Sequence, residues 1–304
     1  MKTTPKRTLL EALRSGRILV SDGAWGTFLK AKGLQVGENP DRWSLDHPRE
    51  VKAIAEAYFA AGADLVETNS FGANSLQLAH FGLSGQAVAI NEAAARLSAE
   101  AAAEAGGEKW VIASVGPTGK LLLMGDVTEA EMAASFREQV VALARGGADA
   151  ICIETMSDIQ EARLALRAVK AHTACTAIVT FTFSRTVQGD YRTMMGVSPE
   201  EAAAAMLADG ADIVGTNCGN GSERMVEIVR AMRSVAAGVP LLVHANAGLP
   251  AQVDGQDVFP ETPAEMAAQV PRLVDAGASI IGGCCGTTPD HIRALRAAVQ
   301  ALSR

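Results

Sequence analysis

The feature that most restricts the fold is a two-part unit that repeats along the whole sequence. A short apolar run rich in β-branched residues is followed by a longer stretch with apolar residues at helical spacing, and the unit occurs eight times. The runs are apolar throughout, which is typical of parallel strands covered on both faces. The predicted strands are 18–22, 64–68, 111–115, 150–154, 177–183, 213–217, 241–246 and 279–283. The predicted helices are 48–61, 86–105, 128–145, 158–171, 199–208, 222–236, 263–276 and 289–302.

Local signals separate these units. Pro199, Pro263 and Pro289 each follow a Ser or Thr, which places a capping hydroxyl before a proline at the first helical position. Glycine C-caps lead directly into strands at 61–64, 146–149, 209–212 and 276–279. Eight such units without a linker predict an α/β protein with a single (βα)8 TIM barrel, one domain over 1–304. An open doubly wound sheet is the alternative, but no Gly-x-Gly-x-x-Gly motif follows the first strand.

Charge and hydropathy exclude several kinds of partner. The formal net charge is -7, so no basic surplus exists to neutralise nucleic acid or an anionic membrane. No run of 18 apolar residues is present to span a bilayer. Glu11, Arg14 and Arg17 interrupt the N-terminal segment, so no secretory signal is expected and the expected location is cytoplasmic.

The cysteines divide into two groups. Five cysteines are too few for a secreted disulfide framework, and an odd number cannot all pair within the chain. Cys152 and Cys175 fall within or just before strands, where cysteine is usually a small packing residue. Cys218, Cys284 and Cys285 instead lie among glycines where strands end, and barrel enzymes place their sites at those ends.

Three thiolates at one barrel mouth predict a zinc site with an open position. Thiolates cancel the charge of the metal and make it a poor activator of water, but such a metal can bind and deprotonate a substrate thiol. The pattern therefore favours a thiol-activating alkyl transferase. A phosphate cradle at the glycine-rich ends of the last two strands is the alternative; it predicts no metal and leaves Cys284 and Cys285 unexplained.

Seven sequence motifs resemble those of a known family. They are Asp-Gly-Ala-x-Gly-Thr, Glu-Thr-Asn-Ser-Phe-Gly-Ala-Asn, Gly-Pro-Thr-Gly, Glu-Thr-Met, Gly-Thr-Asn-Cys-Gly, Asn-Ala-Gly-Leu-Pro and Gly-Gly-Cys-Cys-Gly-Thr-Thr-Pro-Asp-His-Ile. Together they resemble the zinc-dependent homocysteine S-methyltransferases, above all the homocysteine-binding modules of cobalamin-dependent methionine synthases. The resemblance runs from about 18 to 302 and implies a (βα)8 barrel.

The resemblance also implies a set of metal ligands. Cys218, Cys284 and Cys285 match the zinc ligands, through which these residues would be catalytic. Asn246 matches a side chain that fills the fourth position until the homocysteine sulfur displaces it.

Substrate contacts are implied in the same way. Asp22 and Glu154 match acids that hold the amino group of L-homocysteine. Candidates for its carboxylate end are the Ser114 hydroxyl and the main-chain N–H groups of Gly23, Ala24 and Trp25.

Other polar residues near the strand ends have simpler explanations. Glu67 is either a third substrate-facing acid or an anchor for barrel loops, and the sequence leaves both open. Asn69 and Asn217 are expected to brace loops or metal ligands. His244 is expected to be a polar residue of the mouth instead of a ligand, and His291 to make a structural contact.

The resemblance implies methyl transfer to homocysteine, which forms methionine, but it leaves the methyl donor open. The first candidate is a methylcorrinoid (methylcobalamin) supplied in trans by a partner protein or module. The second is a small onium compound, betaine or S-methylmethionine, used without cobalamin. A zinc-holding subunit that binds the thiol but is inactive without its corrinoid partner, and a module excised from a longer chain, also stay open.

Overall fold

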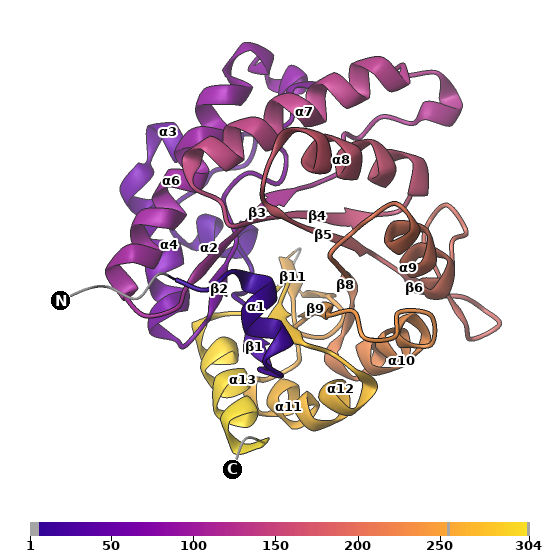
Figure 1. The fold of residues 1–304 in the computed structure, drawn as a ribbon. Coiled ribbons are helices and arrows are strands. Elements are labelled where there is room, and N and C mark those ends of the chain that lie inside the picture. Colours follow the sequence, from indigo (N-terminus) through magenta and orange to yellow (C-terminus); the bar gives the residue numbers. More distant parts are fainter. Residues whose placement is uncertain (1–5, 254–255, 303–304) are drawn as a thin grey trace.

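Eight parallel strands form a nearly closed barrel surrounded by helices, in a computed structural model that describes residues 6–253 and 256–302 (Figure 1). The strands are β1 (Leu19–Val20), β2 (Leu65–Val66), β3 (Trp110–Val115), β4 (Ala150–Met156), β5 (Thr176–Phe181), β8 (Ile213–Gly221), β9 (Leu241–Asn246) and β12 (Ile280–Gly283). Each coincides with a predicted strand, and the predicted (βα)8 TIM barrel is confirmed. The single domain over 1–304 stays a prediction, since 1–5, 254–255 and 303–304 lie outside the described residues.

The barrel closes through carboxylate side chains instead of a final strand ladder: Asp64 bonds Val20, and Asp22 accepts the Glu67 N–H (2.7 Å). The hydrogen-bonded order is β1-β12-β9-β8-β5-β4-β3-β2, which leaves β1 and β2 at the two edges. Asp64, just before β2, donates its N–H to the Val20 carbonyl (2.6 Å) and accepts the Val20 N–H on Oδ2 (2.9 Å). Arg296 from the last helix donates to the same carboxylate. Asp64 therefore joins the two edges.

Alternate strand residues face opposite layers of the core, as a pleated strand requires. Leu19, Leu65 and Ile112 belong to a cluster inside the barrel, while their neighbours Val20 and Val66 pack outward against the helices. All five of these side chains are fully buried, and so both faces of the strands are apolar. This explains why the strand sequences lack polar alternation.

Seven of the eight predicted helices are single helices whose ends lie within three residues of the prediction. They are α4 (Pro48–Ala60), α6 (Ala87–Ala105), α7 (Glu129–Gly146), α8 (Ile159–His172), α9 (Pro199–Ala208), α10 (Ser222–Arg233) and α13 (Pro289–Leu302). The eighth prediction is wrong as a single helix: 263–276 divides into α11 (Pro263–Ala268) and α12 (Val270–Ala276). Pro271 causes the break, because it lacks an N–H and its ring clashes with the preceding turn.

Several short elements have no counterpart among the predictions. These are α1 (Leu9–Arg14), α2 (Gly26–Ala31), α3 (Trp43–Asp46), α5 (Ser75–Leu78), the 3-10 turns Ala79–Phe81, Ser84–Gln86 and Leu122–Met124, and the hairpins β6 (Ser184–Arg185) with β7 (Tyr191–Arg192) and β10 (Ala251–Val253) with β11 (Gln256–Val258). Each is too short for periodicity to reveal. The two hairpins lie in the segments 182–198 and 246–262, each between a strand and the helix that follows it.

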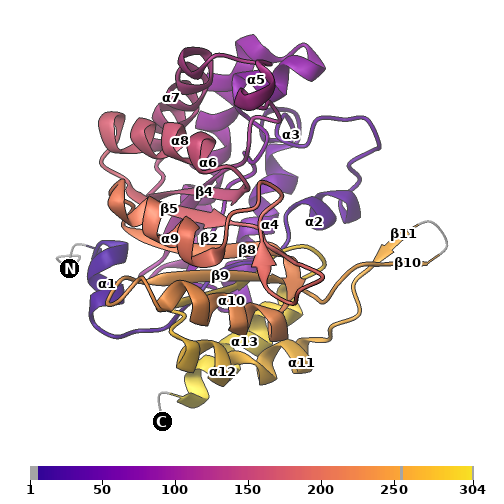
Figure 2. The same cartoon turned by 90° about the vertical axis from the view of Figure 1, so that its right-hand side faces the viewer.

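Helix α1 covers the end of the barrel where the strands begin. Leu9 and Leu13 pack against Leu19, Leu65 and other side chains of the inner cluster. Figure 2 shows α1 at one end of the barrel and the β10–β11 hairpin projecting at the other. Among the described residues, none of the helices combines the length and the hydrophobicity needed to cross a bilayer.

The closure of the barrel predicts a stability difference between two aspartates. Asp64→Ala is expected to lower the free energy of unfolding by about 2–4 kcal/mol, because it removes the side-chain bond to the Val20 N–H and leaves the half-buried Arg296 without its carboxylate. Asp290→Ala breaks the exposed pair with Arg293 and is expected to cost less than about 0.5 kcal/mol. Urea unfolding measures both values. Equal losses in the two variants would contradict the role given to Asp64.

Candidate metal and substrate site

The carboxyl ends of six strands bring the predicted polar residues to one mouth of the barrel. Asp22 follows β1, Glu67 follows β2, Glu154 lies in β4, Cys218 in β8 and Asn246 at the end of β9, while Cys284 and Cys285 follow β12. Parallel strands all end at the same face, so residues more than 260 positions apart in sequence become neighbours.

The three mouth cysteines form a cluster with the dimensions of a metal site. Their sulfurs all lie within 4.8 Å of one another, and Cys218 Sγ and Cys285 Sγ are 3.8 Å apart. Two sulfurs bound at about 2.3 Å to a tetrahedral zinc ion would be separated by about 3.8 Å. The three thiols are half-buried, so a ligand can reach them. The residues present therefore fit a zinc ion.

The other two cysteines pack in the core, as predicted. Cys152 is fully buried in the inner cluster, next to side chains such as Ile178. Cys175 packs against the outer core, and its thiol donates to the carbonyl of Ala148 at 3.3 Å.

Backbone geometry at two strand ends positions the thiols. The β8–β9 register breaks between Asn217 and Gly221, and Cys218 within this break has φ of 59°, in the left-handed region. On the other side, the N–H of Cys284 donates to Ala245 (2.7 Å) and the carbonyl of Cys285 accepts from Ala247 (2.9 Å). These bonds fix the turn after β12 against β9.

Thr287 holds this turn to the first strand, a role that the sequence predictions missed. Its hydroxyl donates to the Cys284 carbonyl (2.7 Å) and accepts the Ala24 N–H (3.0 Å). A Cβ at Gly283 or Gly23 would lie 2.3 or 2.6 Å from this oxygen. Only glycine allows so close an approach at either position. In the sequence, these two glycines were the feature that could have indicated the contact with Thr287.

The protonation of the three thiols depends on their contacts with one another. Hydrogen bonds from Cys284 and Cys285 lower the pKa of Cys218, with a smaller contribution from Asn246. The same bonding raises the pKa of Cys284 well above its ordinary value and that of Cys285 to about 11. The cluster thus stabilises one thiolate, and full ionisation of all three needs a cation among them.

Asn246 presents an oxygen that no protein group occupies. Its Oδ1 is buried and accepts no hydrogen bond within the part of the chain that the structure describes. Because its side chain also contacts Cys218, this carbonyl oxygen is well placed to complete a four-ligand set.

Beside the thiols lie three buried carboxyl groups. Asp22 accepts hydrogen bonds from Trp25 Nε1 (2.8 Å) and the Glu67 N–H (2.7 Å), and Glu154 accepts from Ser114 Oγ and Asn217 Nδ2 (3.0 Å). Burial raises the pKa of all three carboxyls, and their mutual repulsion raises those of Glu67 and Glu154 further. Among the described residues, no lysine or arginine pairs with any of them. This arrangement favours a cationic ligand group.

Glu67 directs its carboxyl into the barrel. Its Oε1 is buried without a hydrogen bond and lies 3.4 Å from His244 Nδ1. Burial lowers the pKa of His244, which favours a neutral ring. His244 lies outside the three-thiol cluster, as predicted, and of the two interpretations of Glu67 the geometry favours a third inward-facing acid.

The candidate donors for the substrate carboxylate have other acceptors in this structure. The Ser114 hydroxyl donates to Glu154, and the Ala24 N–H donates to Thr287. Both groups therefore support other site residues, and the main-chain N–H groups of Gly23 and Trp25 stay predictions for the carboxylate contact.

Two of the neighbouring residues brace loops, as predicted. Asn69 donates to the Pro40 carbonyl at 2.7 Å. His291 accepts from the Thr288 N–H at 3.2 Å and bonds the Glu261 carbonyl at 3.0 Å.

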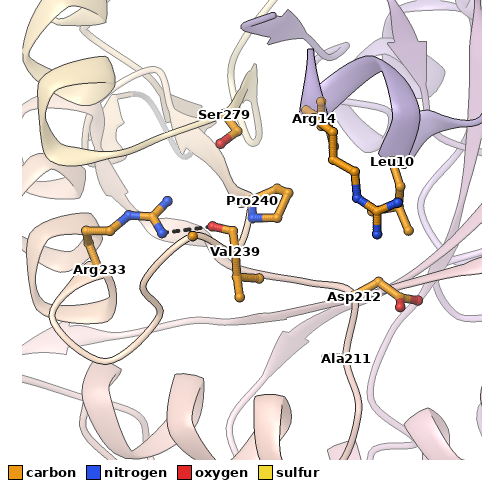
Figure 3. Close-up of a pocket in the computed structure, with 10 residues that line it drawn as sticks. Leu10, Arg14, Ala211, Asp212, Arg233, Val239, Pro240 and Ser279 are labelled. Carbon is orange, nitrogen blue, oxygen red and sulfur yellow. Dashed lines mark hydrogen bonds between the residues drawn. The ribbon is translucent and has the colours of Figure 1, made fainter. Parts of the chain in front are cut away.

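A cavity of about 480 Å³ lies at the opposite end of the barrel, beside α1 (Figure 3). Two of its polar side chains are bonded within the protein: the Arg233 guanidinium donates to the Val239 and Gly277 carbonyls, and Asp212 pairs with Lys170. These side chains stabilise the loops before β8, β9 and β12, so the chemistry is assigned to the mouth with the thiols.

A TIM barrel with three thiols and three buried acids at the carboxyl ends of its strands defines the class of this protein. A family model described as homocysteine S-methyltransferase matches residues 19–299. The chain therefore belongs to the homocysteine S-methyltransferase family, and its enzyme class is that of the methyltransferases.

Individual relatives agree with this assignment. The methionine synthases of Mycobacterium tuberculosis and Mycobacterium leprae are both 32% identical to the chain, over 97% and 96% of its length. The chain spans only 26% and 25% of those proteins, about a quarter of each.

Solved structures point to the same family. The homocysteine methyltransferase MmuM from Escherichia coli, in its metallated form, matches with a TM-score of 0.77 and 27% identity, over 95% of this chain and 99% of MmuM. Pyruvate carboxylase from Rhizobium etli, at 15% identity and a TM-score of 0.52, shares the barrel fold alone.

The cluster predicts which cysteines a metal requires. Wild-type protein incubated with zinc under reducing conditions is expected to retain one equivalent, because three sulfurs lie at tetrahedral spacing. Cys284→Ala is expected to weaken zinc binding at least about 100-fold, since one of the three sulfur ligands is lost. Competition with a chromogenic chelator measures the affinity. Cys175→Ala, outside the cluster, is the matched control and should bind as wild type. Unchanged affinity in Cys284→Ala would rule out the site.

Proposed function

We propose that this protein transfers a methyl group to the thiol of L-homocysteine in a zinc-dependent reaction that forms methionine. The observation that carries the proposal is the juxtaposition, in one barrel mouth, of three thiols whose sulfurs lie within 4.8 Å of one another and three buried acids that pair with no lysine or arginine among the described residues. A ligand with a sulfur at one end and an ammonium at the other complements both groups. Membership of the homocysteine S-methyltransferase family supports homocysteine as that ligand.

Cys218, Cys284 and Cys285 would hold the zinc ion, with Asn246 as fourth ligand until the substrate arrives. Bound there, zinc would supply the acidity that keeps the substrate sulfur a thiolate at neutral pH. The spacing of the sulfurs and the free Oδ1 of Asn246 support this assignment, as does the metallated form of MmuM.

Asp22 and Glu154 would bind the substrate ammonium. Their oxygens are held by donors from Trp25, Ser114 and Asn217, so both carboxylates are oriented before a ligand arrives. Glu67 adds a third buried carboxyl to the same interior. Together they would place the sulfur toward the thiol cluster and the amino group toward the barrel interior.

In the transfer, the sulfur lone pair forms the new S–C bond while the bond between the methyl carbon and the donor breaks. The donor leaves with that electron pair. No side chain needs to act as a base in this step, because the sulfur carries no proton. This agrees with the neutral, buried state favoured for His244.

For the methyl donor we propose a methylcorrinoid (methylcobalamin) carried by a partner protein or module. The relatives named methionine synthase, of which the chain matches about a quarter, support this donor. MmuM supports the alternative, a small donor such as betaine or S-methylmethionine. The match to this chain covers 99% of MmuM, which leaves little of MmuM to form a separate donor module.

Homocysteine binding is expected to weaken as the pH falls, and to do so well above pH 4. The ammonium requires ionised carboxylates, and burial raises the pKa of Asp22 and Glu154 above the ordinary value near 4. Protonation below the raised pKa removes the attraction. Calorimetric titration of the zinc-loaded protein with homocysteine and with 4-mercaptobutanoate, which lacks the amino group, isolates this effect from thiol ionisation.

The same titration tests Glu154 directly. Glu154→Gln is expected to weaken homocysteine binding about 10- to 100-fold, the value of a hydrogen bond to a charged group. Glu161→Gln is the matched control, because Glu161 is also a buried glutamate but its carboxylate bonds Thr118 and none of the residues that hold Asp22 and Glu154. Wild-type affinity in Glu154→Gln would contradict the ammonium site.

The donor is identified by a turnover assay. Zinc-loaded protein is incubated with homocysteine and either methylcobalamin, betaine or S-methylmethionine, and methionine is quantified. We expect methionine to form with methylcobalamin and with neither of the other two donors. Formation only with an onium compound would replace the corrinoid proposal, and absence of zinc-dependent homocysteine binding would overturn the function itself.

A further inference from the structure

Asn217 uses every hydrogen-bonding position of its side chain within the site. Its Nδ2 donates to Glu154 Oε2 (3.0 Å) and Thr155 Oγ1 (2.7 Å), and its Oδ1 accepts from the Thr155 N–H (2.8 Å) and Thr180 Oγ1 (2.8 Å). The residue is fully buried. An amide can donate two hydrogen bonds and accept two, so Asn217 has one defined orientation.

These bonds connect two irregular strand ends. In β4 the register with β5 shifts between Ile153 and Met156, and Thr155 within it has φ of 60°. In β8 the register shifts after Asn217, and Cys218 has φ of 59°. Left-handed backbone is unfavourable for a β-branched residue such as Thr155 and persists only where surrounding contacts hold it. Asn217 supplies two of those contacts, because its side chain bonds both the N–H and the hydroxyl of Thr155.

Each irregular end presents one functional group of the proposed site. The β4 irregularity carries Glu154, which would bind the substrate ammonium, and the β8 irregularity carries Cys218, which would bind the metal. Bulges of this kind commonly re-aim a side chain next to an active site. Strand β5 lies between β4 and β8, so no strand ladder connects the two ends directly.

We infer that Asn217 is a positioning residue that sets the separation of the amino-group site from the thiolate site. The inference rests on the proposed function and extends it: the amide of Asn217 fixes Glu154 on one side and the backbone that leads to Cys218 on the other. It thereby ties the affinity for the amino group to the geometry of the metal ligand. Asn217 itself touches neither the reacting sulfur nor the methyl group.

Two substitutions separate the two connections. Asn217→Asp is isosteric and keeps an acceptor for Thr155 and Thr180, but it turns an oxygen toward Glu154 in place of a donor. Asn217→Ala removes all four bonds. Asn69→Ala is the matched control, because Asn69 is also a buried asparagine after a strand of the mouth but bonds the Pro40 loop.

The experiment measures two binding constants for each variant. Zinc affinity is measured by chelator competition, and affinity for homocysteine and 4-mercaptobutanoate by calorimetry on zinc-loaded protein. Asn217→Asp is expected to weaken homocysteine binding at least tenfold, to change 4-mercaptobutanoate binding less than twofold and to retain zinc. Asn217→Ala is expected to weaken zinc binding about tenfold as well. Asn69→Ala should match wild type in all three.

The inference is overturned if Asn217→Asp weakens the binding of homocysteine and of 4-mercaptobutanoate equally. It is also overturned if the free-energy losses of Asn217→Asp and Glu154→Gln add fully in the double variant, because residues that act through one contact are not additive. Because Asn217→Asp preserves shape and acceptors, its result decides the matter even if Asn217→Ala does not fold. A wild type that binds zinc but no homocysteine would instead refute the proposed function. The zinc affinity of Asn217→Ala would then still test the connection to Cys218.

Discussion

The closure of eight parallel strands into a barrel is the constraint on which the rest of the structure depends. The barrel directs every strand end to one face, where Asp22 lies next to Gly283 and Cys218 next to Cys285. The last seam is closed by Asp64 and its contacts with Val20, in place of a full ladder. A barrel held in this way forms a rigid frame for groups that repel one another at its mouth.

That mouth concentrates groups that are unfavourable without a ligand. Among the described residues, the three buried carboxyls have no lysine or arginine partner and only the buried His244 lies beside Glu67, while three thiols share protons within one cluster. A cation near the sulfurs and an ammonium near the acids would relieve both costs. Glu67 Oε1 and Asn246 Oδ1 add to these unfavourable groups, since each is a buried acceptor without a hydrogen bond from the described residues. Stability given up at the site is therefore recovered on binding.

The sequence predicted the repeating elements well because each is long enough for its apolar pattern to be visible. Its failures were local. Pro271 divides a helix that the pattern extends to residue 276, and α1 (Leu9–Arg14) is too short to be recognised without the barrel end that it covers. Side-chain partners were less accessible still, because a sequence does not show that the Ser114 hydroxyl is committed to Glu154 or the Ala24 N–H to Thr287.

By itself, the sequence determined the (βα)8 architecture, the division of the cysteines and the identity of the chemical groups at the mouth. Apolar periodicity and strand-end residues are properties of neighbours along the chain, and they survive without coordinates. Tertiary structure alone decided how those groups meet: the 3.8 Å between Cys218 and Cys285, the inward carboxyl of Glu67, and the four bonds of Asn217. These depend on bulges and left-handed residues in separate strands, whose register is set only when the barrel closes.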